Sequence, residues 1–285
     1  MRTFLRNNAV FIAISLTLIL ALTLAVVFIP KGDLHLLLCN RHTPVRDIIY
    51  RNYTHVAEWL PYIICLAILL FGRVGNAALA TSCIACSELF TQIVKHIVCA
   101  PRPLTWFAAN MPDVQLPLVE GVRVHHWLSF PSGHTTSFFA LFFAISIVAT
   151  KSLAAKRANC ENDQQRLFSI GMAVLLQIIL VLLAALGGYS RIYLSQHFAM
   201  DVLGGMTVGV LISTVCYAIF SRYEDQKWYN YRILKKKMTS NAFFLPKNLV
   251  MSKKSSTFAL GFERQGYQGL MRLKNGTSDN SKTGV

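Results

Sequence analysis

Charged residues are scarce in this sequence: of its 285 residues, only 14% are Asp, Glu, Lys or Arg. Hydrophobic residues make up 54% of the chain, and the mean hydropathy is +0.44. A soluble domain needs far more charge on its surface than this chain can supply. We therefore interpret the sequence as that of a polytopic membrane protein.

Acidic residues are scarcer than basic ones: the chain has 13 Asp and Glu against 28 Lys and Arg, which gives a formal net charge of +15. Much of the excess lies after Ser221, where 13 basic residues face 4 acidic ones. A basic segment beside a membrane usually faces the cytoplasm and its anionic lipids. Nothing in the chain resembles a DNA- or RNA-binding module, so we expect no nucleic-acid partner.

The cysteine pattern argues against a disulfide-stapled fold, because the chain has an odd number of cysteines, seven. Cys83 and Cys86 form a Cys-x-x-Cys without a second pair, and we interpret them as small hydrophobic residues of an apolar run. The adjacent His125 and His126 are interpreted as surface histidines. No group of Asp, Glu and His has the spacing of metal ligands, so we expect neither a metal nor another cofactor.

Six apolar runs predict an all-α bundle of about six transmembrane helices. They cover residues 9–29, 60–70 (extending toward 73), 76–100, 132–150, 168–188 and 202–220. The first run is about 21 residues long, against roughly 7–15 for the core of a signal peptide, and is interpreted as a retained helix. We expect a first helix in residues 1–30, a membrane-embedded core in 31–221 and a basic, mostly disordered cytoplasmic tail in 222–285.

The segments between these runs predict the orientation of the chain. Residues 31–57 predict a mixed loop with short interfacial helices, 104–130 a polar loop, and 151–166 a polar, basic connector. Basic residues near the ends of the runs favour cytoplasmic termini. The polar residues that then fall together on the outer side are Lys95, Arg102, Ser132, His134, Arg191, His197 and Asp201.

The tetrapeptide Pro131-Ser132-Gly133-His134 stands where a polar loop meets an apolar run. Ser132 is placed to cap the helix that follows, and the free N–H groups and dipole of a helix start favour an anion. Gly133 lets the backbone approach a ligand, and His134 can release a proton near neutral pH. A Ser-Gly turn that opens a helix is common, so this motif predicts a site only together with other segments.

Positive charge is supplied by a lysine and two arginines. Glu88, Gln92 and Lys95 are spaced by four and three residues, so they share one face of the third predicted helix. Glu88 and Gln92 either orient Lys95 or satisfy polar groups within the bundle. Arg102 and Arg191 carry planar guanidinium groups that suit the oxygens of a phosphate.

A histidine and a carboxylate just before the sixth predicted helix, His197 and Asp201, suggest nucleophilic chemistry. His197 and Asp201 are four residues apart, so on a helix the carboxylate can reach one ring nitrogen of His197. That contact would fix the tautomer and leave the other nitrogen free to attack phosphorus. His134, on another helix, can protonate the departing oxygen, and the three cations can neutralise the phosphate charge without a metal.

Taken in order, these segments resemble the tripartite signature of the type 2 phosphatidic acid phosphatase family, the superfamily of lipid phosphate phosphatases and vanadium haloperoxidases. The signature positions are Lys95 and Arg102-Pro103, then Pro131-Ser132-Gly133-His134, then Ser190-Arg191, His197 and Asp201. The resemblance implies a helical core bundle, with His197 as a nucleophile that forms a phosphohistidine, Asp201 as its orienting partner and His134 as the acid. It also implies a phosphate site made by Lys95, Arg102, Ser132, Gly133 and Arg191.

We therefore expect a membrane-embedded, metal-independent lipid phosphate phosphatase of the inner (plasma) membrane, with both termini in the cytoplasm and the active site at the periplasmic or outer face. Candidate substrates are undecaprenyl pyrophosphate, the phosphates of lipid A, phosphatidate and phosphatidylglycerophosphate, and the motifs do not choose among them. Two alternatives stay open: a phosphotransferase with an acceptor other than water, and a non-catalytic transporter or scaffold. The sequence leaves the oligomeric state undetermined.

Overall fold

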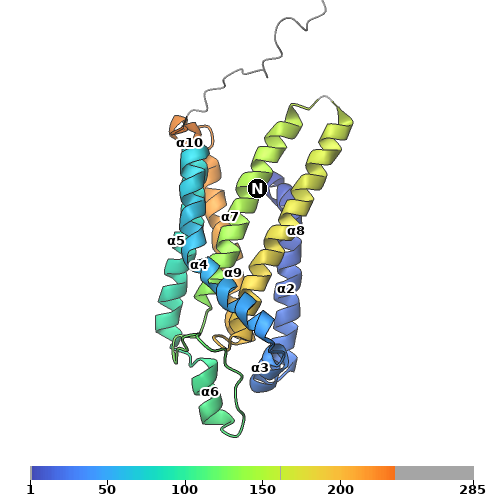
Figure 1. The fold of residues 1–285 in the computed structure, drawn as a ribbon. Coiled ribbons are helices and arrows are strands. Elements are labelled where there is room, and N and C mark those ends of the chain that lie inside the picture. The colour runs from blue at the N-terminus through green and yellow to red at the C-terminus, as the bar shows by residue number, and fades with distance from the viewer. Residues whose placement is uncertain (1, 161, 235–285) are drawn as a thin grey trace, which may run out of the picture. The chain divides into compact units, whose positions relative to one another are not determined.

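The structure, a computed structural model, describes residues 2–160 and 162–234, and these residues form helices without any strand (Figure 1). The helices are α1 (Arg2–Asn7), α2 (Ala9–Phe28), α3 (Lys31–Cys39), α4 (Pro44–Phe71), α5 (Val74–Val98), α6 (Pro103–Asn110), α7 (Gly133–Ala158), α8 (Asp163–Tyr193), α9 (Ala199–Phe220) and α10 (Lys227–Asn230). A 3₁₀ turn at Ser221–Tyr223 follows α9. The disorder predicted for the tail falls, from residue 235 on, outside the described residues.

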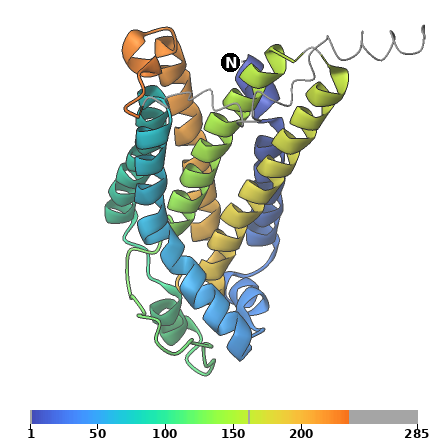
Figure 2. The same cartoon turned by 45° about the horizontal axis from the view of Figure 1, so that its top comes forward.

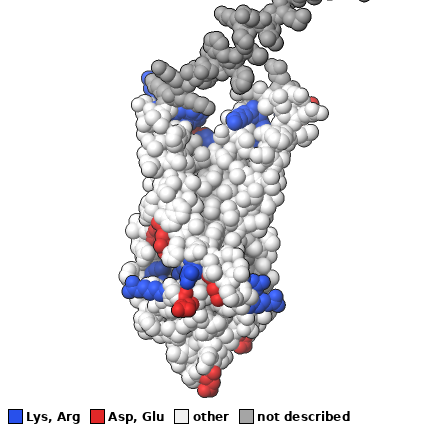
Figure 3. Space-filling model, viewed as in Figure 1, with Lys and Arg blue, Asp and Glu red and all other residues white. Residues whose placement is uncertain are grey.

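Six helices in the described part of the chain are long and apolar enough to cross a membrane: α2, α4, α5, α7, α8 and α9. Figures 1 and 2 show that they run alternately up and down, with α10 and the α7–α8 turn at one end and α3 and α6 at the other. Figure 3 shows charged side chains near both ends of the bundle and an uncharged belt between them. Because the core of a bilayer disfavours charge, this pattern confirms the predicted polytopic bundle.

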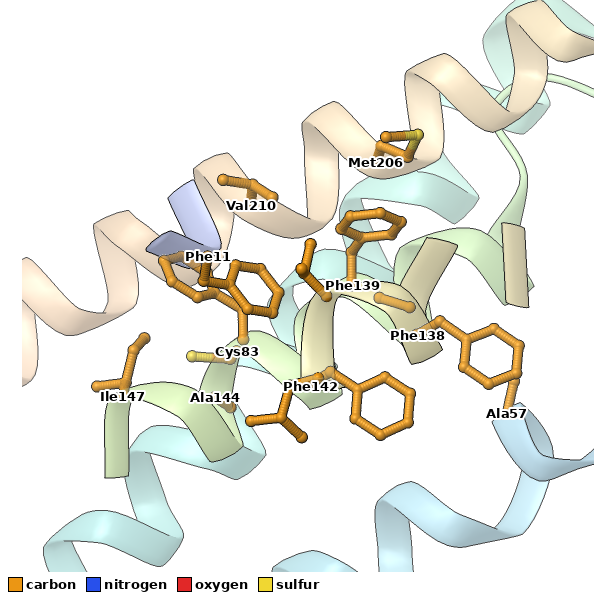
Figure 4. Close-up of a cluster of buried hydrophobic side chains, with 14 of the residues drawn as sticks. Phe11, Ala57, Cys83, Phe138, Phe139, Phe142, Ala144, Ile147, Met206 and Val210 are labelled. Atoms are coloured by element: carbon orange, nitrogen blue, oxygen red, sulfur yellow. The ribbon is translucent and has the colours of Figure 1, made fainter. Parts of the chain in front are cut away.

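Helix α7 is the centre of the bundle and packs against α5, α8 and α9. Its apolar residues lie all round the helix rather than on one face, as expected for a helix enclosed by others. Phe138, Phe139 and Phe142 are buried, and they belong to one hydrophobic cluster with Met206 and Val210 of α9 (Figure 4). Since lipid tails are as apolar as these side chains, the contact is stabilised mainly by close packing.

Two glycines of α9 allow that helix to approach α7 at backbone distance. A Cβ on Gly205 would lie 2.6 Å from the carbonyl oxygen of Ser132, and a Cβ on Gly209 would lie 3.0 Å from that of Thr136. Small residues four apart permit such close helix contacts in membranes. The approach brings the starts of both helices together, where the N–H of Ser132 donates to the carbonyl of Asp201 at 2.9 Å.

The predicted loop over residues 31–57 is wrong in its second half, although α3 confirms a short helix in its first half. Helix α4 begins at Pro44, and Thr43 caps it by accepting the N–H of Arg46 at 3.3 Å. Proline suits the first helical position because it has no N–H that would lack a partner there. Charged residues in the first turns of α4 dilute the apolar periodicity, so hydropathy detects only the second half of the helix.

Two other predicted loops are shorter than expected. The segment 104–130 contains helix α6, which begins at Pro103. The connector predicted over 151–166 shrinks to 159–162, because α7 extends to Ala158 and Asn162 caps α8 by accepting the N–H of Gln164 at 2.8 Å. Helices that leave the bilayer remain helical in water, whereas hydropathy marks only their membrane-embedded part.

Candidate active site

The eight predicted site residues come together at one end of the bundle, at helix ends and in the connections beside them. They are Lys95, Arg102, Ser132, Gly133, His134, Arg191, His197 and Asp201. The last turns of α5 and α8 contribute two cations, while the first turns of α7 and α9 contribute a histidine and a carboxylate. Six of the eight line one cavity, and Ser132 and Asp201 lie behind its wall.

His197 lies in the connection between α8 and α9 and is 1% exposed. The Oδ2 atom of Asp201 lies 3.6 Å from Nδ1 of His197. Ser129 connects the two, since its Oγ is 3.4 Å from the same Nδ1 and donates to Oδ2 of Asp201 at 2.6 Å. The N–H of Phe198 also donates to this Oδ2, at 2.8 Å. These contacts occupy the Nδ1 side of the ring and leave Nε2 as the nitrogen that can react.

The charge state of His197 suits a nucleophile. Burial lowers the pKa of His197 well below its usual value of 6.5, and the neighbouring Arg102, Arg191 and Lys95 lower it further. The imidazole is therefore neutral at physiological pH, and a neutral ring nitrogen has the free electron pair that attack requires. The same three cations attract an anion into the site.

The two arginines are held by oxygen atoms of uncharged groups. Arg102 donates from Nε to the carbonyl of Trp127 at 3.0 Å and from Nη1 to the carbonyl of Gln196 at 3.3 Å. Arg191 donates from Nη1 to Oγ1 of Thr54 at 2.5 Å, and its buried Nε has no hydrogen-bond partner among the described residues. A guanidinium that is positioned without a carboxylate keeps its positive charge available for a phosphate.

Helix α7 begins at the wall of the cavity, where Gly133 faces α5. A Cβ at Gly133 would lie 3.5 Å from Nζ of Lys95 and 3.7 Å from Oε2 of Glu88, so glycine keeps this space open beside the helix start. Ser132 caps the helix, and its Oγ accepts the O–H of Thr135 at 2.9 Å. The side chain of Ser132 therefore shapes the start of the helix, while Gly133 lines the cavity itself.

The cavity has a volume of about 480 Å³ and joins the cationic cluster to apolar surfaces of α4 and α5. At its polar end it is lined by Lys95, Arg102, Arg191, His125, His134 and His197. Its apolar lining comes from Ala57, Pro61, Tyr62 and Ile84. Ile84 precedes Lys95 by three turns of α5, which corresponds to roughly 16 Å along the helix axis. The cavity therefore extends from the polar end of the bundle toward the middle of the membrane.

Four residues that sequence reasoning did not assign to the site contact or adjoin the predicted ones: Thr54, Glu58, His125 and Ser129. The Oε1 atom of Glu58 lies 3.3 Å from Nε2 of His134. His125 is exposed, as expected, yet it lines the cavity. Partial desolvation at the cavity wall, together with nearby cations including Arg102, lowers the pKa of His125. Thr54 and Glu58 are four residues apart, a helical spacing that has no meaning in a segment interpreted as a loop.

Fold and cavity together define a multi-pass helical membrane protein with a histidine-bearing, cation-lined site at one end of its bundle. The chain belongs to the PAP2 superfamily, because the model of that family matches residues 76–225, more than half of the chain. This match confirms the resemblance carried by the three motifs, all of which lie within it.

Known relatives and solved structures are similar to this chain. Over 107 residues it is 33% identical to phosphatidylglycerophosphatase B of Bacillus subtilis, a match that covers 38% of this chain and 44% of the relative. Over 189 residues it is 26% identical to an undecaprenyl-diphosphatase of the same organism, covering 65% and 79%. The chain thus spans less than half the length of the first of these relatives.

The crystal structure of a transmembrane PAP2-type phosphatidylglycerolphosphate phosphatase from Bacillus subtilis shares the fold. Its TM-score is 0.52 at 19% sequence identity, and the match covers 78% of this chain and 99% of that one. At this identity the similarity supports the arrangement of the helices alone.

Proposed function

We propose that this protein is a membrane-embedded phosphatase that releases inorganic phosphate from a lipid phosphate or lipid pyrophosphate. The observation that carries the proposal is the two-ended cavity, with cations and histidines at one end and apolar side chains at the other. Such a cavity matches an amphiphile whose polar head is a phosphate. The names of the two relatives, a phosphatidylglycerophosphatase and an undecaprenyl-diphosphatase, support a lipid of this kind.

The phosphate would be bound by Lys95, Arg102 and Arg191 together with the start of α7 at Gly133. The Nε of Arg191, which has no partner within residues 2–160 and 162–234, is a donor that a phosphate oxygen would satisfy. The N–H groups at the start of a helix add partial positive charge. Binding at this point would place the phosphorus between the cations, in reach of the histidines that line the same cavity.

In the first half of the proposed reaction, Nε2 of His197 attacks phosphorus and the bond to the lipid oxygen breaks. His134 gives its proton to that oxygen, so the lipid leaves as an alcohol or, from a pyrophosphate, as a lipid monophosphate. The phosphoryl group stays on His197 as a phosphohistidine. Asp201 and Ser129 hold the Nδ1 side of the ring and offset the positive charge that develops there.

In the second half, water attacks the phosphohistidine and the bond between phosphorus and nitrogen breaks. His134, neutral after the first step, takes the proton from the water, and inorganic phosphate leaves. Both histidines return to their starting forms. Within residues 2–160 and 162–234, no group of three or more His, Cys, Asp or Glu is placed to hold a metal ion, and the cations can supply the charge that phosphoryl transfer requires.

We also infer that the protein lies in the inner membrane, with its site at the outer face and its termini in the cytoplasm. Basic residues gather at the end opposite the site: Arg2, Arg6, Arg73, Lys151, Lys156, Arg157, Arg166 and Arg222. Several basic residues at the other end belong to the site and have a chemical reason to be there. Charge bias of this kind favours the cytoplasm for the opposite end.

The orientation is tested with a variant whose native cysteines are replaced and that carries one new cysteine in residues 104–130. An impermeant thiol reagent should label this cysteine in intact cells or spheroplasts. Labelling that requires lysis would place the site on the cytoplasmic side.

The proposed activity is tested by measuring phosphate release by the purified full-length protein in EDTA. The panel comprises phosphatidate, phosphatidylglycerophosphate, undecaprenyl pyrophosphate and a lipid A phosphate, each with and without a second acceptor lipid. We expect release from at least one lipid in chelator, because the cations are part of the chain. Transfer to the acceptor lipid would indicate a phosphotransferase, and no turnover of any lipid would contradict the proposal.

A further inference from the structure

Glu58 of α4 lies outside all three motifs, yet its carboxylate contacts two histidines. Its Oε1 is 3.3 Å from Nε2 of His134, and its Oε2 is 3.2 Å from Nδ1 of His55. The side chain of Glu58 is 54% exposed, and it lines the same cavity as the three cations. A carboxylate thus lies in a cavity that is otherwise suited to an anion.

A negative charge at this position opposes phosphate binding, since like charges repel across a cavity of low dielectric. What it can favour is the protonated form of His134. The groups that face this ring from other elements are mostly positive or able to become so: Lys95 of α5, Arg102 before α6, Arg191 of α8, and His125 and His197 of the connecting segments. Each positive charge among them disfavours the positive charge that the imidazole of His134 gains on protonation.

Two carboxylates line the cavity in the described part of the chain, and they differ in their contacts. Glu88 of α5 accepts a hydrogen bond from the hydroxyl of Ser137 and forms no hydrogen bond or ion pair with a histidine of the described residues. Glu58 is the one whose oxygen touches a ring nitrogen of His134. Of the two, Glu58 therefore has the direct means to act on the proton of that ring.

We propose that Glu58 is a positioning residue for His134: its carboxylate accepts the N–H at Nε2 and stabilises the imidazolium form, so that the other ring nitrogen, Nδ1, gives its proton to the departing lipid oxygen. This inference rests on the proposed function, in which His134 is the acid. The proton passes from Nδ1 to the lipid oxygen and returns to Nδ1 from water in the second half of the reaction. Glu58 itself binds no substrate atom.

The test compares two substrates that differ in their need for the acid. An alkyl phosphate such as phosphatidate releases a strongly basic alkoxide, whereas p-nitrophenyl phosphate releases an oxide that leaves without much help. In full-length Glu58→Gln, kcat/KM for phosphatidate, which reports the steps up to phosphohistidine formation, should fall by at least about tenfold, while kcat/KM for the aryl phosphate should change by less than about threefold. KM should not rise for either, because a charge that repels phosphate has been removed.

Two further variants separate this role from a structural one. Glu88→Gln removes the other carboxylate of the cavity and should alter KM for both substrates alike, without dependence on the leaving group. Glu58→Asp keeps the charge on a shorter side chain and should retain more phosphatidate activity than Glu58→Gln. If Glu58→Gln does not purify in the folded state, the comparison of Glu58→Asp with wild type on both substrates takes its place.

A double-variant cycle gives the sharpest result. Once His134 is absent, removal of Glu58 should have little further effect on phosphatidate, so His134→Ala with Glu58→Gln should match His134→Ala alone within about threefold. Equal losses on both substrates, or losses that multiply in the double variant, would overturn the positioning role. A wild-type protein that releases phosphate from neither substrate would instead overturn the proposed function.

Discussion

Of the three histidines that line the cavity, His197 and His134 each have a carboxylate neighbour, and these two pairs are built very differently. The side chains of His197 and Asp201 are 1% and 6% exposed, and those of His134 and Glu58 are 29% and 54% exposed. Asp201 also accepts from the hydroxyl of Ser129 and from a backbone N–H. Glu58 has its second contact with an exposed histidine.

The difference fits the tasks proposed for the two rings. A nucleophile reacts from one tautomer and one orientation, so rigid and water-free surroundings favour it. An acid must lose a proton, regain it from water and face a leaving group of variable size. A partner on a separate helix, partly open to solvent, permits those changes. If the two rings have these tasks, substitutions in the two pairs will change activity in different ways and not only by different amounts.

The largest effect is expected for His197→Ala. This change removes the nitrogen that would carry the phosphoryl group, so no phosphoenzyme should form from any substrate. The protein is allowed to react briefly with a lipid whose phosphate is labelled, and the label bound to the protein is divided into acid-stable and acid-labile fractions. Turnover of the lipid is then measured separately. His96→Ala, at an exposed position of α5, serves as the control and should behave like wild type. Histidine-linked phosphate in His197→Ala would show that the nucleophile is assigned wrongly.

A smaller and selective effect is expected for His134→Ala. General acids typically contribute about 10²–10⁴-fold, and this loss should appear on an alkyl phosphate. An aryl phosphate needs less protonation, so it should recover part of the activity. Initial rates on both substrates at matched expression measure the difference. Equal losses on the two would mean that His134 acts on binding or folding and not on the leaving oxygen.

A still smaller effect is expected for Ser129→Ala, which removes the hydroxyl between His197 and Asp201. One hydrogen bond to a charged group is lost, worth about 1.5–3 kcal/mol, so kcat should fall roughly 10- to 100-fold on alkyl and aryl substrates alike. Ser146→Ala is the matched control, since Ser146 is also buried and donates to Asn8 at 3.0 Å far from the site. It should lower thermal stability to a similar degree and leave kcat unchanged.

The motifs predicted more of the site than of its surroundings. Lys95, Arg102, His134 and His197 were found because charged or titratable residues at the ends of apolar runs are conspicuous, and the structure brings them into one cavity. The six spans were found for a related reason, since a run of about 20 apolar residues is long enough to cross a bilayer and is rare in soluble domains. Both signals are local in the sequence.

The contacts within the site join residues that are far apart in the sequence, so the sequence predicts them less well. Glu58 reaches His134 from α4, a helix whose polar first turns look like a loop by hydropathy. Ser129 is one serine among many in polar connections. Its meeting with Asp201 depends on the close approach of α7 and α9, which no single segment encodes.

That approach of α7 and α9 gives the last and smallest prediction for activity. Gly205→Ala places a methyl group 2.6 Å from the carbonyl oxygen of Ser132, a backbone atom that cannot rotate away. Overpacking of this kind costs roughly 1–3 kcal/mol, and it pushes apart the helix starts that carry Asp201 and His134. Because both pairs shift together, kcat should fall by a few-fold on alkyl and aryl phosphates equally, with a lower midpoint of thermal unfolding. Gly171→Ala is the matched control: a Cβ there meets nothing within 4 Å, and alanine is the better helix former by about 1 kcal/mol, so stability should hold or rise. A Gly205→Ala protein as stable as wild type, or one that loses activity on the alkyl phosphate alone, would show that the two pairs are not aligned through this contact.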